Sequence, residues 1–86
     1  MREIERSLKA LANRRRLSIV KYLKQNREAP VADVAAAINL SFKATSKHLA
    51  LLSAADIVDK EQRSVQVFYR LSDNLRSPVK HIISLL

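Results

Sequence analysis

Two lysines four positions apart, Lys43 and Lys47, are the residues of this chain best suited to chemistry with a polyanion. Both fall in a segment that Ser41 opens as an N-cap and that continues with helical periodicity through Ser53. At about 100° per residue, the two ammonium groups lie on one face of this helix, away from its apolar side. An ammonium group donates to phosphate oxygens or to O6 and N7 of guanine, so this face is suited to a nucleic acid duplex.

The side chains beside these lysines complete a candidate DNA-contact surface. Ser46 can donate to a phosphate or to the helix carbonyl four residues earlier, and His48 is suited either to packing at the edge of the core or to DNA contact. Phe42 and Thr45 project toward the apolar side, so we assign both to packing. The alternative for the whole surface is a solvated basic face without base contacts. The candidate DNA-binding residues of this helix are Lys43, Ala44, Ser46, Lys47 and His48.

Cations outside this helix predict further contacts with the DNA backbone. Arg14, Arg15 and Arg16 begin a predicted helix, where positive charge opposes the helix dipole, so helix stability does not explain them. Contact with a DNA phosphate or an intramolecular ion pair would explain these arginines. We assign Arg14 and Arg15 to contacts with DNA phosphates. Lys60 and Arg63 lie on a predicted hairpin, where they can reach the backbone or the minor groove or remain solvated.

Hydrophobic periodicity predicts the elements that position these residues. Apolar residues recur at helical spacing in five segments and alternate in two, with residues 26 to 29 left as a loop. The predicted helices are 2–12, 14–25, 30–38, 41–53 and 77–86, and the predicted strands are 57–61 and 65–71. Asn13, Asn39 and Ser41 supply the cap and turn residues, and Ser77 with Pro78 begins the last helix. The hairpin tip at residues 62 to 64 has no glycine, because the chain has none.

This order of elements predicts a mainly α fold with a small β-hairpin. Four helices, two strands and a last helix form a winged helix-turn-helix, with the basic helix 41–53 where such modules place their DNA reader. A chain of 86 residues makes one domain, residues 1–86. Tyr22 and Tyr69 are assigned to the core or a dimer contact rather than to stacking on bases.

Composition supports a polyanion as the partner and excludes several other classes. Sixteen Lys and Arg against eight Asp and Glu give a net charge of +8. There is no cysteine, which excludes disulfides and thiolate metal sites. No apolar run suffices to cross a membrane and no signal peptide is present, so we expect a soluble cytoplasmic protein. A glycine-rich phosphate loop and a cysteine nucleophile are also absent, so we do not expect an enzyme.

Several short segments carry a resemblance to a known family. They are Leu8-Lys9-Ala10-Leu11-Ala12-Asn13 with Arg16-Leu17, Asn39-Leu40-Ser41, Ser46-Lys47-His48-Leu49 and Val67-Phe68-Tyr69-Arg70-Leu71. Their order and spacing, over residues 7 to 73, resemble the arsenic-repressor (ArsR/SmtB) family. The resemblance implies a structural role for Arg16 and a homodimer joined through helices 2–12 and 77–86 that binds an imperfect palindrome. The interface residues that follow are Ile4, Leu8, Val79, Ile82, Ile83 and Leu86.

The chain departs from this family at its metal-sensing positions. Metal-sensing members often carry two cysteines near the start of the third helix, where this chain has Pro30 and Ala32. Asp73 and His81 remain from a second family site, but their spacing does not reproduce its pattern. Because zinc requires three or four ligands, we expect neither a metal nor another cofactor, and no residue pattern identifies an effector.

These observations predict a sequence-specific regulator of transcription that binds double-stranded DNA as a homodimer and represses by occupying a palindromic operator. The alternative is a winged helix used as a protein-interaction or assembly module, whose basic face meets an acidic partner.

Overall fold

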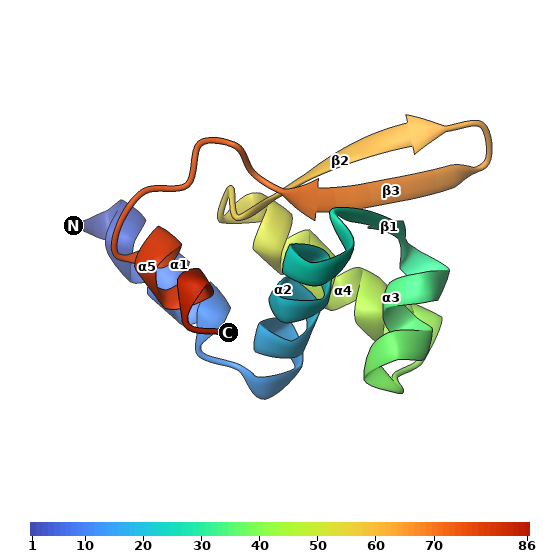
Figure 1. Ribbon diagram of the computed structural model, residues 1–86, viewed down its shortest axis with the longest axis horizontal. Helices are drawn as coiled ribbons and strands as arrows, with labels where there is room; N and C mark the ends of the chain where they lie inside the picture. Colours follow the sequence, from blue (N-terminus) through green and yellow to red (C-terminus); the bar gives the residue numbers. More distant parts are fainter.

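Five helices and a three-stranded antiparallel sheet make up the computed structural model of the chain, which describes residues 1–86 (Figure 1). In chain order the elements are α1 (Arg2–Leu11), α2 (Arg14–Asn26), β1 (Glu28–Pro30), α3 (Val31–Ile38), α4 (Phe42–Ala54), β2 (Val58–Arg63), β3 (Gln66–Leu71) and α5 (Val79–Ser84). The mainly α fold with a β-hairpin is confirmed, as is α3–turn–α4 followed directly by the hairpin. None of the five helices combines the length and the hydrophobicity that a membrane-spanning segment requires.

Cap residues begin and end the helices as their side-chain chemistry predicts. The Asn13 side chain accepts hydrogen bonds from the backbone N–H groups of Arg15 at 3.0 Å and Arg16 at 3.1 Å. Ser41 Oγ accepts from the N–H of Ala44 at 3.1 Å. Asn39 ends α3 in the left-handed region, with φ 56° and ψ 52°. The caps at Asn39 and Ser41 set the sharp turn between α3 and α4.

Strand β1 was not predicted, and the loop assigned to residues 26 to 29 is wrong. It pairs with β3 in an antiparallel register that sets Ala29 opposite Tyr69, so the sheet order is β1-β3-β2. Pro30 ends this edge strand with an extended backbone instead of lying in the first turn of α3. An edge position suits a residue that has no N–H to donate.

The core lies between the helices and one face of the sheet. The hairpin lies across the top of the molecule in Figure 1, with α2, α3 and α4 beneath it. Fully buried apolar side chains from α2, from α4 and from the residue before β2 meet there and fix α4 against the sheet. The largest of them are Ile19, Leu23, Leu49, Leu52 and Ile57. Tyr69 is also buried and Tyr22 packs on the core half-buried, which confirms a core role for both.

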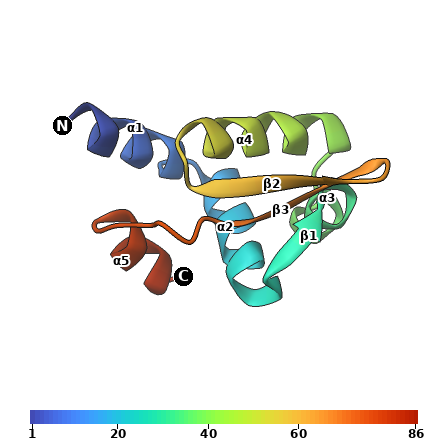
Figure 2. The ribbon, with the colours of Figure 1, turned by 90° about the horizontal axis from the view of Figure 1, so that it is seen from above.

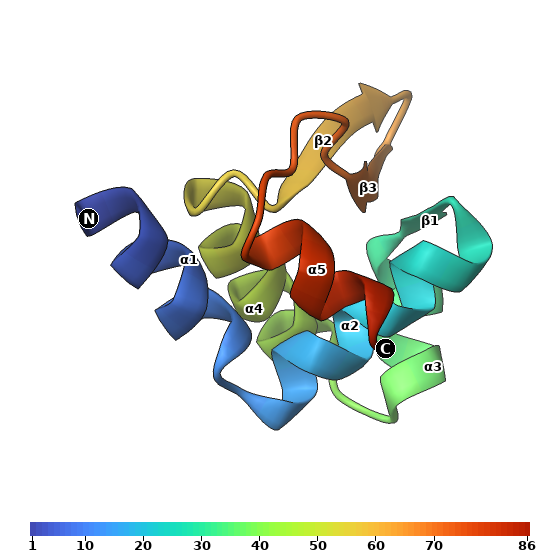
Figure 3. The ribbon, with the colours of Figure 1, turned by 60° about the vertical axis from the view of Figure 1, so that its left-hand side comes forward.

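Helix α5 is shorter than predicted and begins later. It covers only Val79–Ser84, with Pro78 at its N-cap position, so the prediction that Ser77 caps it is wrong. Lys24 Nζ donates to the carbonyls of Ile83 and Ser84 at 3.2 Å, which ties the end of α5 to α2. Figure 3 shows α1 and α5 at the same end of the molecule, with α5 over α2.

Candidate nucleic-acid interface

The outer face of α4 presents two cations that no other part of the chain engages. Lys43 and Lys47 are exposed, and neither makes an ion pair or a hydrogen bond through its ammonium group. The opposite side of α4 carries Thr45, Leu49 and Leu52, all 0% exposed, so the rotation of the helix about its axis is fixed. Figure 2 shows α4 along one edge of the molecule with no element beyond it. Both ammonium groups are therefore free to meet a duplex.

Small side chains flank these lysines. Ala44 and Ser46 are half-buried, and the hydroxyl of Ser46 makes no hydrogen bond within the chain. The alternative of a bond from Ser46 to its own helix is therefore not realised, and the hydroxyl is free to donate. The contact of Ala44 and Ser46 with DNA stays a prediction.

His48 is held at the back of this surface by Arg16. Arg16 Nη1 lies 3.2 Å from His48 Nδ1, and because a guanidinium only donates, Nδ1 accepts and the ring proton is on Nε2. Burial lowers the pKa of the imidazole below its ordinary value, and the charges of Arg16 and Arg15 lower this pKa further. His48 is therefore a neutral, half-buried ring with an N–H donor at Nε2.

The three arginines at the start of α2 have three different roles. Arg16 Nε donates to the carbonyl of Ala10 and Nη2 to that of Lys9, which joins the end of α1 to α2 and confirms its structural role. Arg15 Nη1 donates to the carbonyl of Ile38 at 3.3 Å, so Arg15 lies beside the turn between α3 and α4. The Arg14 guanidinium is exposed and makes no hydrogen bond or ion pair. Of the two arginines predicted to contact phosphates, only Arg14 has a guanidinium group without a partner in its own chain.

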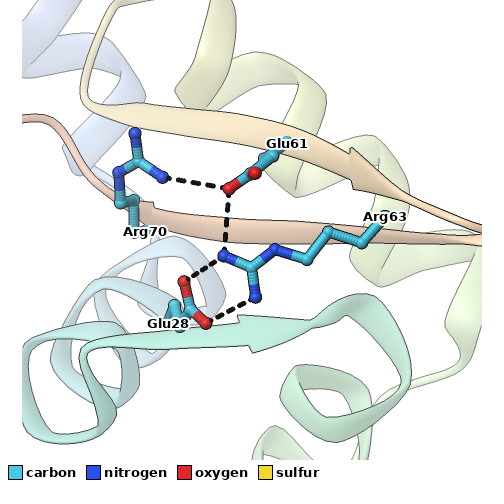
Figure 4. Close-up of polar contacts among 4 residues, drawn as sticks. All are labelled: Glu28, Glu61, Arg63 and Arg70. Carbon is cyan, nitrogen blue, oxygen red and sulfur yellow. Dashed lines mark hydrogen bonds and ion pairs between the residues drawn. The ribbon is translucent and has the colours of Figure 1, made fainter.

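Arg63 lies in an ion-pair network on the outer face of the sheet, which Figure 4 shows. Its Nη1 and Nη2 donate to the Glu28 carboxylate at 2.7 and 2.8 Å, and Nη2 also donates to Glu61 at 2.9 Å. Arg70 Nη1 lies 3.6 Å from Glu61, and the Arg63 guanidinium covers the Phe68 ring at 4.5 Å from its centroid. The hydrogen bonds from Arg63 hold the pKa of Glu28 and of Glu61 below their ordinary values.

Because of this network, the cation nearest the hairpin tip is paired within its own chain. The charge of Arg63 is shared with two carboxylates of its own chain, although its side chain is still 40% exposed. The turn itself consists of Ser64, at φ 58°, and Val65, which is 92% exposed. Lys60 is opposite Tyr69 in the register and thus on the helix side of the sheet, exposed and unpaired. Contact of Lys60 or Arg63 with DNA stays a prediction.

The predicted dimer residues separate into two groups. Ile4 and Leu8 on α1 are 44% and 40% exposed and, with Met1 and Ala12, line a hollow of about 380 Å³, which we call the α1 apolar face. Val79 and Ile83 are buried in the core of the same chain, and Ile82 and Leu86 pack on that core half-buried. Of the predicted interface residues, Ile4 and Leu8 are therefore exposed to a second copy, whereas those of the last segment are wholly or partly covered within their own chain.

Phe42 is the residue that sequence reasoning misplaced. It is 60% exposed, whereas Thr45, assigned to packing by the same argument, is fully buried. The helical projection turns Phe42 toward the core, but Phe42 is the first residue of α4 and lies beyond the end of that core. The positions of the neighbouring elements, and not the helical projection alone, decide whether this side chain is covered.

Neither Asp73 nor His81 belongs to a cluster of ligands. No group of three or more His, Cys, Asp or Glu lies close enough together to hold a metal ion.

Comparisons with known proteins agree with this geometry. A family model described as bacterial regulatory protein, arsR family, matches residues 13–60, from the cap of α2 into β2. The transcriptional activator HlyU of Vibrio cholerae serotype O1 is 40% identical over 79 residues, which cover 92% of this chain and 69% of HlyU. The arsenical resistance operon repressor of Bacillus subtilis is 32% identical over 73 residues, which cover 85% of this chain and 70% of the repressor.

Solved structures share the fold over nearly the whole chain. Reduced HlyU from Vibrio cholerae has a TM-score of 0.83 at 38% identity, covering 99% of this chain and 85% of that one. A homodimeric winged helix-turn-helix DNA-binding domain from Mycobacterium bovis, described as a possible ArsR-family transcriptional regulator, has a TM-score of 0.84 at 28% identity. That match covers 98% of this chain and 74% of the other.

Proposed function

The chain belongs to the ArsR family of bacterial regulatory proteins, and from this premise we propose that it regulates transcription by binding a palindromic operator as a symmetric homodimer. The observation that carries the proposal is the uncovered face of α4 with its two unpaired lysines. In a helix-turn-helix, the second helix enters the major groove and its N-terminal residues contact base edges. Lys43 and Lys47 lie in the first two turns of α4, so they are in position to donate to guanine or to phosphate.

The net charge and the positions of further hydrogen-bond donors also support DNA binding. A net charge of +8 attracts a duplex without regard to sequence. Two unpaired cations lie outside α4, namely Arg14 at the start of α2 and Lys60 on the hairpin. They would add phosphate contacts at either side of the groove. Ser46 and the Nε2–H of His48 add neutral donors to the same helix.

A dimer supplies what one copy lacks. A single reader helix covers few base pairs, whereas two copies can place their α4 helices in successive major grooves about 34–36 Å apart. The α1 apolar face is exposed and fits a second copy related by twofold symmetry. The Mycobacterium bovis relative is described as homodimeric.

The direction of regulation stays a prediction. Repression by occupancy is the simplest consequence of operator binding, but one relative is described as an activator and another as a repressor. Enzymatic activity is no part of this proposal, and we place the protein in the cytoplasm because a bacterial regulator must reach chromosomal DNA there.

Binding to an operator selected from a random duplex pool tests the proposal. If the dimer neutralises about six to ten phosphates, its affinity should fall by roughly 10³ to 10⁵ between about 50 and 200 mM salt. Operator duplex should compete far better than random duplex. A flat salt response, or weak binding that operator does not compete, would instead favour a module that meets an acidic protein.

A further inference from the structure

Phe42 is the one aromatic residue of the chain whose ring is largely uncovered. The other three are engaged, since Tyr69 is buried, Tyr22 packs on the core and Phe68 lies under the Arg63 guanidinium. Phe42 is 60% exposed at the first residue of α4. The hydrogen bond from the Ala44 N–H to Ser41 Oγ fixes the backbone at this point, so the ring projects from an ordered helix start.

The position of Phe42 separates it from the surface that a second copy would cover. The α1 apolar face lies at one end of the molecule, whereas α4 begins near α3, at the other end (Figures 1 and 2). The next residue along the chain is Lys43, one of the two unpaired cations of the candidate DNA surface. The ring therefore lies at the edge of that surface and not at the dimer contact.

The major groove offers one apolar group to such a ring. Each thymine presents its C5-methyl group at the groove floor, beside the donors and acceptors of the other base edges, and phenylalanine is among the side chains that contact it. The N-terminal residues of a reader helix are the ones that contact base edges. A ring at the first position of α4 is therefore in the place from which a thymine methyl can be reached.

We propose that Phe42 is a specificity-determining residue whose ring packs against the C5-methyl group of a thymine in each operator half-site. The inference rests on the proposed function and adds to the lysine contacts a preference for thymine at one position. It makes the protein sensitive to the loss of a methyl group that takes part in no base pairing.

The test replaces thymine by deoxyuridine, which lacks only this methyl group, at one position at a time in both half-sites of the selected operator. At one position the wild-type affinity should fall about fourfold per half-site and about fifteenfold for both, as expected for one methyl group returned to water. The Phe42→Ala protein should bind the thymine operator more weakly and show no further loss at that position. Leu51→Ala, which changes a 52% exposed apolar residue of the same helix, should keep the wild-type response to deoxyuridine.

The outcomes separate this inference from the proposed function. Circular dichroism and the melting temperature of Phe42→Ala should match wild type, because the ring lies outside the core. Three outcomes would overturn the inference and leave the proposed function standing. The first is tight operator binding with no effect of deoxyuridine on affinity at any position. The others are an equal loss of affinity in wild type and Phe42→Ala, and selected half-sites that contain no thymine. Failure of the wild-type protein to bind any duplex at low salt would overturn both.

Discussion

At the scale of single residues, the structure separates cations that are free from cations that are already engaged. Lys43, Lys47 and Arg14 have no partner in the chain, whereas Arg16 and Arg63 are held by groups of their own molecule. The sequence shows where the charges are but not which of them are neutralised, because Glu28 and Arg63 are 35 positions apart and meet only through the sheet. Caps were predictable because their partners are two or three residues away.

Lys47 and Arg14 should differ in what they recognise. Lys47→Ala should cost about 1–3 kcal/mol of operator binding per half-site and less for random duplex, if Lys47 donates to guanine. Arg14→Ala should weaken binding to both duplexes alike and reduce the salt slope by about 1 per protomer, as a phosphate contact does. Fluorescence anisotropy with both duplexes at several salt concentrations measures both effects. If Lys47→Ala loses the same affinity for operator and for random DNA, Lys47 contacts a phosphate and not a base.

His48 should make folding stability depend on pH. Its pKa in the folded protein is below the ordinary 6.5, so between the two values the unfolded chain binds a proton that the folded chain does not. The contribution of His48 is therefore fully present above about pH 6.5 and is lost as the pH falls below it. Urea unfolding at fixed protein concentration should show a smaller loss of stability from about pH 7.5 to 5.5 in His48→Gln than in wild type.

His81 provides the control for this measurement. Its side chain is exposed and makes no hydrogen bond, so His81→Gln replaces a histidine without touching the contact between Arg16 and His48. If His48→Gln and wild type lose the same stability over this range, burial and the charges of Arg16 and Arg15 do not lower the pKa of His48 in the folded protein.

At the scale of elements, the helices were predictable and the sheet only in part. Helical periodicity and caps identify α1 to α4 within one or two residues, because both signals are local. Strand β1 has three residues, too few to show alternation, and its partner β3 is about forty positions away. Helix α5 was predicted too long because its apolar residues, which pack on the core from Val79 to Leu86, extend beyond the helix itself.

The ion-pair network makes the hairpin part of the body of the molecule. Arg63 on β2 reaches across β3 to Glu28 on β1, and β1 leads directly into α3. The network therefore couples the direction of the hairpin to the helix-turn-helix. Because all its members are substantially exposed, we expect it to order the hairpin locally and to add little to global stability.

Arg63→Ala should loosen the hairpin without unfolding the protein. Amide hydrogen exchange in residues 62 to 67 should become faster, while the midpoint of urea unfolding changes little. Arg63→Lys should give an intermediate effect, because lysine keeps the charge but cannot make the two-point contact with Glu28. Arg76→Ala, which removes an exposed and unpaired arginine, is the matched control. Unchanged exchange in Arg63→Ala would show that the network does not order the hairpin.

At the scale of the whole molecule, the account requires two copies. The family resemblance implied a homodimer, but the interface expected from it included two residues, Val79 and Ile83, that fill the core of their own chain. An apolar stripe on a helix does not show which partner it meets. Only the packing of α5 on α2 reveals that Val79 and Ile83 are covered within their own chain.

Leu8→Glu should separate the two copies. Leu8 is 40% exposed and lies outside the core, so a charge there should disrupt the dimer contact and spare the fold. Sedimentation equilibrium should find a monomer, and operator affinity should fall toward that for random duplex. Arg2→Glu, about 120° around α1 from Leu8, should remain dimeric. A dimeric Leu8→Glu protein would place the interface elsewhere.

The central claim is that α4 carries the surface that meets DNA, and amide chemical-shift mapping during titration with operator duplex tests it most directly. We expect the largest shifts in residues 41 to 51, smaller ones at the start of α2 and on the hairpin, and little change in α5. Shifts confined to other elements, or none at low salt, would contradict it.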